Sequence, residues 1–181
     1  FAISNQFYMI CQNQNLNFFK IRNIMREGYM RNANIPESGF TAGPCLLKDT
    51  MQLSSFYNHR FKLGHAAMSV NEGIPIFIIK KLQKKFDLRK KTVGVLGLTF
   101  KAETDDIRDS LSIKLVKLLE LKKIKTLQSD EFYKNKKNIS KNDLVKKSDI
   151  IILATPHKAY KRLKIKKNKT VVDIWGLIEN K

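Results

Sequence analysis

The chain has 181 residues, and its 35 Lys and Arg residues exceed its 16 Asp and Glu residues to give a formal net charge of +19. Because 43% of the residues are hydrophobic, the composition excludes a disordered chain and favours one full domain or two small ones. The longest uncharged apolar runs, such as residues 150–154, are too short to cross a bilayer, and the N-terminus lacks the basic region of a signal peptide.

The positive charge is spread along the chain in lysine pairs and is not gathered in one segment. We interpret these lysines as solvent-facing residues, because net charge reports on solubility and non-specific binding and not on fold. The alternative, a basic nucleic-acid-binding protein, predicts steeply salt-dependent DNA binding, and no recognised nucleic-acid motif supports it. The excess charge does favour anionic small-molecule ligands.

The first part of the chain is predicted to be helical. Apolar residues recur with a helical period in residues 1–11, and a second helical stretch covers residues 16–31. Residues 34–39 form a loop rich in turn-forming residues. A third helix is expected to begin near Cys45 and to continue through residues 51–56.

A fourth, long helix is predicted over residues 65–86, with Pro75 as a kink or a break. Its apolar residues form a face that is broader than one small sheet would cover. Such a helix often connects domains or forms a dimer contact, so we expect a homodimer through residues 65–86. The alternative is that the helix covers only its own domain.

From Lys91 the pattern changes to short β-branched runs that alternate with helices. Strands are predicted at residues 92–97, 125–130, 148–155 and 170–174, with helices at residues 110–121 and 143–147. Asp109 is expected to cap the first of these helices. Strands separated by helices predict a Rossmann-like, doubly wound parallel α/β sheet. We therefore expect a helical domain over residues 1–90 and an α/β domain over residues 91–181.

The two cysteines, Cys11 and Cys45, indicate the redox setting. Two cysteines do not make a disulfide scaffold, so the reducing cytoplasm is the expected location. Neither cysteine belongs to a CxxC or Cys/His cluster, so no metal site is expected.

Residues 39–50, GFTAGPCLLKDT, lead a loop of glycines and a proline into a cysteine. If a helix begins at Cys45, its N-terminus and the positive charge of Lys48 favour the nucleophilic thiolate. Asp49 follows Cys45 by four residues and lies on the same side of such a helix. This group of residues suits nucleophilic catalysis. The alternative is a buried cysteine in a tight turn, with Lys48 and Asp49 exposed.

A second group of candidate residues follows the strand predicted at residues 92–97. The loop after this strand leads into a helix, and doubly wound folds bind ligands in the crevice at this end of the sheet. Lys101 and Arg108 are fixed cations in that loop and suit phosphate oxygens. The glycine pattern of the loop is not a dinucleotide-binding fingerprint. The alternative is that Arg108 pairs with Asp105 or Asp106 and braces the loop.

Together these segments resemble the UDP-glucose/GDP-mannose dehydrogenase family of nucleotide-sugar dehydrogenases. The active-site signature of the family matches residues 39–50, and its nucleotide-binding signature matches VGVLGLTFKAETDDIRDS at residues 93–110. Further matches follow the order of the family at Asn71–Glu72, residues 148–157 and residues 171–176. The resemblance covers essentially the whole chain.

Members of this family oxidise the C6 hydroxyl of a nucleotide-linked hexose to a carboxylate with NAD, through a cysteine thiohemiacetal and a thioester. The resemblance implies that Cys45 is the nucleophile, that Asp49 orients or activates water, and that Lys48 lies near the NAD cofactor. It also implies that Lys101 meets the phosphates of the substrate and that Arg108 reaches toward the pyrophosphate of NAD.

The same resemblance assigns three residues to the substrate. Gly43 lets the backbone approach the sugar closely, and Phe40 belongs to the same loop. Arg31 precedes that loop and is a candidate for contacting the substrate across a dimer. A UDP-sugar is the expected substrate, because the loop GPCLLKDT is similar to that of enzymes acting on UDP-sugars.

Two departures from the family pattern limit the expected activity. Leu47 stands where many relatives have Pro, and the Gly-rich NAD loop of the family's N-terminal domain is not found in this sequence. The chain is therefore expected to be a C-terminal portion that does not turn over NAD by itself, which NADH absorbance with NAD and UDP-sugars would test. The alternative function is a non-catalytic module that binds a nucleotide sugar or only dimerises.

Overall fold

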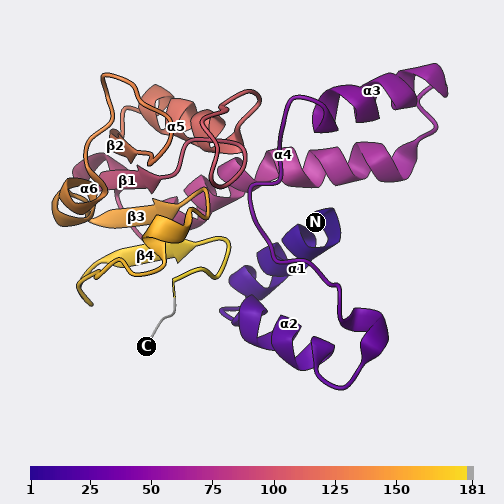
Figure 1. The fold of residues 1–181 in the computed structure, drawn as a ribbon, viewed down its shortest axis with the longest axis horizontal. Coiled ribbons are helices and arrows are strands. Elements are labelled where there is room, and N and C mark those ends of the chain that lie inside the picture. The colour runs from indigo at the N-terminus through magenta and orange to yellow at the C-terminus, as the bar shows by residue number, and fades with distance from the viewer. Residues whose placement is uncertain (179–181) are drawn as a thin grey trace.

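The computed structural model of the chain describes residues 1–178, in which a helical N-terminal region precedes a parallel sheet (Figure 1). The α-helices are α1 (Ala2–Asn13), α2 (Phe18–Arg26), α3 (Leu46–Phe56), α4 (Lys62–Gln83), α5 (Leu111–Leu121) and α6 (Lys141–Lys147). The strands are β1 (Thr92–Leu96), β2 (Lys125–Ser129), β3 (Ile150–Leu153) and β4 (Thr170–Asp173). Short 3-10 helices cover Met30–Asn32, Leu88–Lys90 and Lys158–Tyr160. This order confirms the predicted fold class, a helical region followed by a parallel α/β sheet.

The sheet has the strand order β2-β1-β3-β4, and each pair of neighbouring strands is parallel. The chain leaves β1 through α5 to reach β2 on one side, and it returns through α6 to β3 on the other side of β1. This reversal creates a topological switch point between the carboxyl ends of β1 and β3. Open α/β sheets bind their ligands at such a point. The loops that follow these two strands are therefore the expected ligand-binding region.

Alternate residues of the strands pack on opposite faces of the sheet. Val93 and Ile152 belong to a core that includes side chains of α5 and α4, whereas Leu96 and Ile151 belong to a second core with Leu144 of α6. Helices therefore cover both faces, which explains why β1 and β3 are continuous apolar runs in the sequence.

Gly94 allows α6 to pack closely on β1. A Cβ atom at this position would lie 2.9 Å from Cγ of Leu144 and closer still to the Ser148 hydroxyl. We expect Gly94→Ala to lower the free energy of unfolding by about 2 kcal/mol, because an extra carbon in a packed site forces its neighbours apart. Urea denaturation measures this change.

Gly73→Ala is the matched control for that substitution. Gly73 lies within α4, and nothing lies within 4 Å of an added Cβ atom there. Alanine should raise the free energy of unfolding by about 0.5–1 kcal/mol at this position, because it favours the helix. Similar effects of the two substitutions would contradict the close packing of α6 on Gly94.

The helical region shares a hydrophobic core with the sheet. α4 continues through Pro75 without a break, so the break considered from the sequence is absent. The α4 residues Ile74 and Ile78 are buried in the same core as Val93 of β1.

Of the helices within residues 1–178, none is both long and apolar enough to span a bilayer.

α1 forms where the sequence predicts a helix, but its periodic apolar residues are not the ones it buries. The side chains that it buries are those of Ser4, Asn5, Tyr8 and Cys11. Ile3, Phe7 and Ile10 are exposed instead. This side faces inward because the side chain of Asn5 bonds both the amide and the carbonyl of Gly39.

The cap of α5 corrects a prediction. The helix is capped by Ser110, whose hydroxyl accepts from the amides of Ser112 and Ile113 at 3.2 and 3.5 Å. The cap predicted at Asp109 is wrong, and Asp109 adopts a φ of 51° in the preceding turn. Ser110 takes this place because its hydroxyl also donates to the Leu98 carbonyl at 2.7 Å, which ties the start of α5 to the loop after β1.

Candidate functional site

The Gly-rich loop before α3 lies between the helical region and the carboxyl edge of the sheet. On the helical side, the amide of Gly39 donates to Oδ1 of Asn5 at 2.8 Å, and Nδ2 of Asn5 donates to the Gly39 carbonyl at 3.0 Å. On the sheet side, the Ser38 hydroxyl donates to the Ile174 carbonyl at 2.6 Å. The loop is therefore fixed from both sides.

The turn after β4 supports the same loop through Trp175. The indole Nε1 donates to the Ala154 carbonyl, just after β3, at 2.9 Å. Gly39 packs directly on the face of the indole ring, so that no Cβ would fit there. Glycine is required at position 39 by this close approach.

Cys45 is exposed at the N-terminus of α3. Its carbonyl accepts from the amide of Asp49 at 2.8 Å, which forms the first turn of the helix. The side chains of Lys48 and Asp49 are each 61% exposed and form an ion pair of 3.2 Å. The helix start predicted near Cys45 is confirmed, and the alternative of a buried cysteine is wrong because the thiol reaches solvent.

The loop after β1 carries Lys101 and Arg108, and both side chains are exposed. Arg108 forms a forked pair with Asp106, with Nη2 and Nε at 2.7 and 3.0 Å from Oδ2. This is one of the bracing contacts that the sequence leaves open as an alternative. The hydrogen bonds and charge of Asp106 raise the pKa of the Arg108 guanidinium, and the same pair lowers the pKa of Asp106.

The two loops meet near the carboxyl end of β1. A Cβ atom at Gly43 would lie 3.2 Å from two ring carbons of Phe100, so the backbone of Gly43 rests on that ring. The φ of Gly43 is 144°, which favours glycine. The hydrogen bonds to Asp106 and its charge are the main causes of the raised pKa of Arg108, and Cys45 lies near enough to add a smaller electrostatic effect. Gly43 and Cys45 of the cysteine loop therefore lie close to Phe100 and Arg108 of the loop after β1. Lys101 follows Phe100 in the chain.

Two of the predicted substrate residues, Arg31 and Phe40, lie elsewhere than at the contact between the two loops. Arg31 is exposed in the 3-10 helix Met30–Asn32, and within residues 1–178 no hydrogen bond or ion pair joins its side chain to either loop. The side chain of Phe40 is buried in the hydrophobic core that the helices share with the sheet. Phe40 therefore anchors the Gly-rich loop by packing.

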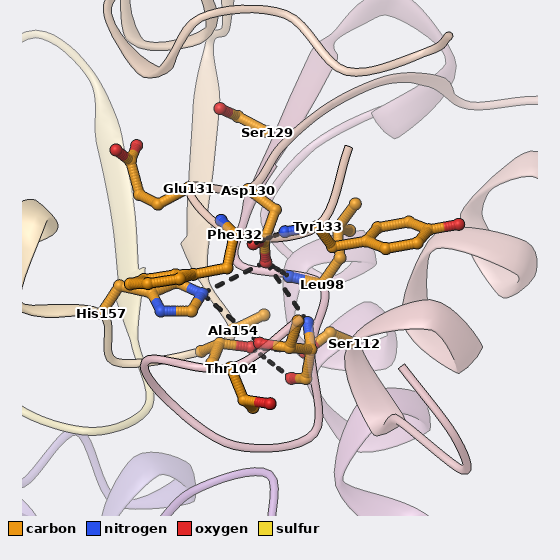
Figure 2. Close-up of polar contacts among 12 residues, drawn as sticks. Leu98, Thr104, Ser112, Ser129, Asp130, Glu131, Phe132, Tyr133, Ala154 and His157 are labelled. Carbon is orange, nitrogen blue, oxygen red and sulfur yellow. Dashed lines mark hydrogen bonds and ion pairs between the residues drawn. The ribbon is translucent and has the colours of Figure 1, made fainter. Parts of the chain in front are cut away.

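Sequence reasoning missed a buried polar network at the same edge of the sheet, centred on Asp130 (Figure 2). Oδ2 of Asp130 accepts from the amides of Leu98 and Thr99 at 2.6 and 3.3 Å. Oδ1 accepts from the amides of Phe132 and Tyr133 at 2.8 and 2.9 Å. Burial alone would raise the pKa of Asp130, but hydrogen bonds from a histidine and from these amides outweigh it and lower the pKa.

The histidine of this network is His157, which is fully buried. Its Nδ1 accepts from the Glu103 amide at 3.0 Å, so the ring proton lies on Nε2, which donates to Oδ2 of Asp130 at 3.2 Å. Figure 2 shows the imidazole beside the ring of Phe132, with ring centres 5.0 Å apart. Tyr160 contacts the imidazole edge-on at 5.3 Å. The Thr99 hydroxyl also lies 3.4 Å from Nε2. The ring is thus held by polar contacts at both nitrogens and by two aromatic neighbours.

A signal for this network was present in the sequence. Asp130 directly follows β2, and His157 follows β3 by a few residues. Because the carboxyl ends of parallel strands meet at one edge, polar residues at these positions are expected to lie close together.

The residues of this sheet do not fit NAD. Dinucleotide-binding folds place an acidic residue near the end of the second strand, where it bonds a ribose hydroxyl. Asp130 stands at that place, but its two oxygens accept from four backbone amides and from His157. The loop after β1 also lacks the glycine fingerprint of an NAD site. Within residues 1–178, the sheet therefore does not offer the groups that a dinucleotide site requires.

Known proteins share this arrangement of elements. The chain superposes on the UDP-D-ManNAc dehydrogenase of Pyrococcus horikoshii with a TM-score of 0.82 at 24% identity, over 99% of this chain and 45% of that chain. It superposes on a UDP-glucose dehydrogenase from Pyrobaculum islandicum with a TM-score of 0.78 at 21% identity, over 96% of this chain and 44% of that chain. These likenesses establish the fold.

Sequence comparisons agree with the structural ones. The chain is 31% identical over 160 residues to a UDP-glucose 6-dehydrogenase of Rickettsia felis. The aligned region covers 76% of this chain and 36% of the relative. The chain thus spans less than half the length of the curated relatives that it matches. Residues 94–180 match the family model described as the UDP-glucose/GDP-mannose dehydrogenase family, UDP binding domain. With the motifs and the fold in agreement, the chain belongs to the UDP-glucose/GDP-mannose dehydrogenase family.

Proposed function

We propose that this chain binds a UDP-sugar at the carboxyl edge of its sheet and supplies the cysteine nucleophile of a nucleotide-sugar 6-dehydrogenase. In this proposal a helical domain, residues 1–90, provides the cysteine loop, and an α/β domain, residues 91–181, provides the phosphate-binding loop. The observation that supports it is the contact of these loops at the switch point of the sheet, where Gly43 rests on Phe100.

The diphosphate of the substrate would be bound by two cations of the loop after β1. Lys101 is exposed, and a lysine ammonium suits phosphate oxygens as a point charge. Arg108 is 72% exposed, and Asp106 holds its guanidinium in a fixed orientation. Arg108 would also approach the pyrophosphate of NAD, and Lys48 would lie near the same cofactor. NAD itself would be bound outside residues 1–178.

The sugar would react at the cysteine loop. The thiolate of Cys45 would add to the carbon of the C6 aldehyde, and the resulting oxyanion would take up a proton to form a thiohemiacetal. Loss of a hydride to NAD and of the hydroxyl proton to solvent would convert the thiohemiacetal into a thioester. Asp49 would orient the water that cleaves this thioester to the carboxylate and the free Cys45 thiol. Gly43 and Phe40 shape the loop around the sugar, and Arg31 would reach the substrate only from a second copy of the chain.

Binding of UDP to the chain tests the proposal. We expect isothermal titration calorimetry with UDP and UDP-glucose to detect binding. Lys101→Ala should weaken the affinity for UDP by about tenfold, since a charge-assisted hydrogen bond contributes about 1.5–3 kcal/mol. Lys117→Ala is the matched control, because Lys117 is an exposed lysine on α5. No detectable binding of UDP, or equal losses in the two variants, would overturn the proposal.

The thiol of Cys45 should react much faster than that of Cys11. Cys45 is exposed, whereas Cys11 is 7% exposed in α1, and reactivity follows access. We expect a maleimide to label Cys45 at least about tenfold faster, which mass spectrometry of labelled peptides measures, and UDP-glucose should slow the labelling. UDP binding without any effect of UDP-glucose on Cys45 would instead favour the non-catalytic binding module.

Because both cysteines are free thiols, we place the activity in the cytoplasm.

We further propose a homodimer that forms through α4 and the adjacent α3. Apolar side chains on these helices are exposed, among them Leu53, Phe56, Leu63 and Ile76. The far end of α4 is covered by the chain's own core, so the contact would use its N-terminal part. Sedimentation equilibrium should give twice the mass of the chain, and Phe56→Ser with Leu63→Ser should halve it. A monomer at all concentrations would exclude this dimer.

A further inference from the structure

We infer that His157 is a positioning residue for nucleotide binding, because it holds the loop after β1 in the shape that presents Lys101 to the diphosphate. The inference rests on the proposed function. His157 does not itself reach solvent, so it acts through the loop and not by contact with a ligand.

The loop is anchored on both sides of Lys101. Before it, the amides of Leu98 and Thr99 donate to Oδ2 of Asp130 at 2.6 and 3.3 Å. After it, the amide of Glu103 donates to Nδ1 of His157 at 3.0 Å. The exposed lysine therefore stands between two buried anchors, and His157 joins them because its Nε2 donates to Asp130.

Imidazole is well suited to this bridge. One ring nitrogen accepts from the Glu103 amide while the other donates to Asp130, so a single rigid ring makes both contacts. Contacts with Phe132 and Tyr160 fix the plane of the ring. Because the ring is fully buried, water does not replace a lost contact without further rearrangement.

Other contacts hold the start of the loop independently of His157. The Thr155 hydroxyl donates to the Thr99 carbonyl at 2.7 Å, and the Ser110 hydroxyl donates to the Leu98 carbonyl at 2.7 Å. The Glu103 side of the loop has fewer anchors, among them the amide of Lys158, which donates to the Glu103 carboxylate at 3.0 Å. The Lys101 carbonyl accepts from the Thr99 hydroxyl at 2.8 Å, and this hydroxyl also contacts Nε2 of His157 at 3.4 Å. Loss of the imidazole acceptor should therefore loosen residues 102–104, which follow Lys101, and leave the fold in place.

Two substitutions separate the two contacts of the ring. His157→Gln places an amide nitrogen near the position of Nε2, so it keeps the donor to Asp130 and loses the acceptor for the Glu103 amide. His157→Asn places an amide oxygen near the position of Nδ1, so it keeps the acceptor and loses the donor to Asp130. We expect His157→Gln to weaken UDP binding by about tenfold, because each backbone residue that is ordered on binding costs about that factor. His157→Asn should weaken it by about threefold or less, since the anchor on Glu103 remains.

The experiment is a double-mutant cycle with Lys101→Ala, read as UDP affinity by calorimetry, with urea denaturation of each variant in parallel. If His157 positions Lys101, the loss caused by His157→Gln should largely disappear once the lysine is absent. A purely structural role would lower the stability but leave the same loss of affinity in both backgrounds.

Each result decides between the two proposals. Wild-type binding with unchanged affinity in His157→Gln, or fully additive losses in the cycle, would overturn the positioning role and leave the proposed function standing. Absence of UDP binding by the wild-type chain would overturn both. If His157→Gln does not fold, His157→Asn is compared directly with the wild-type chain. A loss of UDP affinity well above threefold in that variant would overturn the inference, because its anchor on Glu103 remains.

Discussion

Replacing Gly97 with Ala is expected to lower the free energy of unfolding by about 3 kcal/mol. The φ of Gly97 is 86°, a conformation that alanine rarely adopts. A Cβ atom there would also lie 2.7 Å from the Thr155 amide nitrogen and 2.8 Å from its Cα, both of which are backbone atoms. Neither atom can move aside without displacing the loop after β3, so the strain and the clash add.

Gly28→Ala separates these two causes. Gly28 has a φ of 67°, but nothing lies within 4 Å of an added Cβ atom. Its substitution should therefore cost only the conformational strain, about 1 kcal/mol. Urea denaturation of both variants gives the comparison, and equal losses would show that Thr155 does not restrict position 97. If the proposed UDP site is correct, Gly97→Ala should also weaken UDP binding, because the amide of Gly97 donates to the Ser129 carbonyl at 2.9 Å and so fixes the start of the loop after β1.

The second large effect is a loss of stability in acid that depends on Asp130. Its pKa in the folded protein is lowered, while the unfolded carboxyl keeps its usual value of about 3.9. The unfolded chain therefore takes up the proton more readily, so the contribution of Asp130 is fully present above about pH 4 and is lost as the pH falls through the folded pKa. Stability of the wild-type chain should decline in that acid range.

Asp130→Asn tests this contribution. At pH 7 the variant should be about 3 kcal/mol less stable, because an amide has one acceptor oxygen where the carboxylate has two and the neighbouring donors are buried. The difference from wild type should shrink as the pH falls below about 4, because protonated aspartic acid loses the same contacts. Urea denaturation from pH 7 to pH 3 measures it. Asp49→Asn, at an exposed carboxylate, should show little change, and a pH-independent difference for Asp130→Asn would contradict the argument.

Local sequence signals were enough for most of the elements and for the start of the helix that follows Cys45. The β-branched run at residues 92–97 and the apolar run at residues 148–155 contain β1 and β3. The loop of glycines before Cys45 predicted the start of α3. These features depend on residues close together in the chain, and hydrophobic period and turn chemistry report on such residues directly.

Features that depend on distant residues were not predictable in the same way. Asn5 is buried because it bonds Gly39, 34 residues away. Ser110 replaces Asp109 as the cap because its hydroxyl also reaches the Leu98 carbonyl. The pair of Asp130 and His157 is 27 residues apart in the chain, and only the strand order brings it together. Tertiary packing decided each of these cases.

The position of Trp175 gives the chain a built-in optical reporter. It is the only tryptophan in the sequence, and its indole lies between Gly39 of the cysteine loop and the Ala154 carbonyl at the end of β3. Indole emission shifts with the polarity around the ring, so any ligand that displaces the cysteine loop would change the intrinsic fluorescence. Movement of the loop that leads to Cys45 is therefore observable without attaching a dye to the protein.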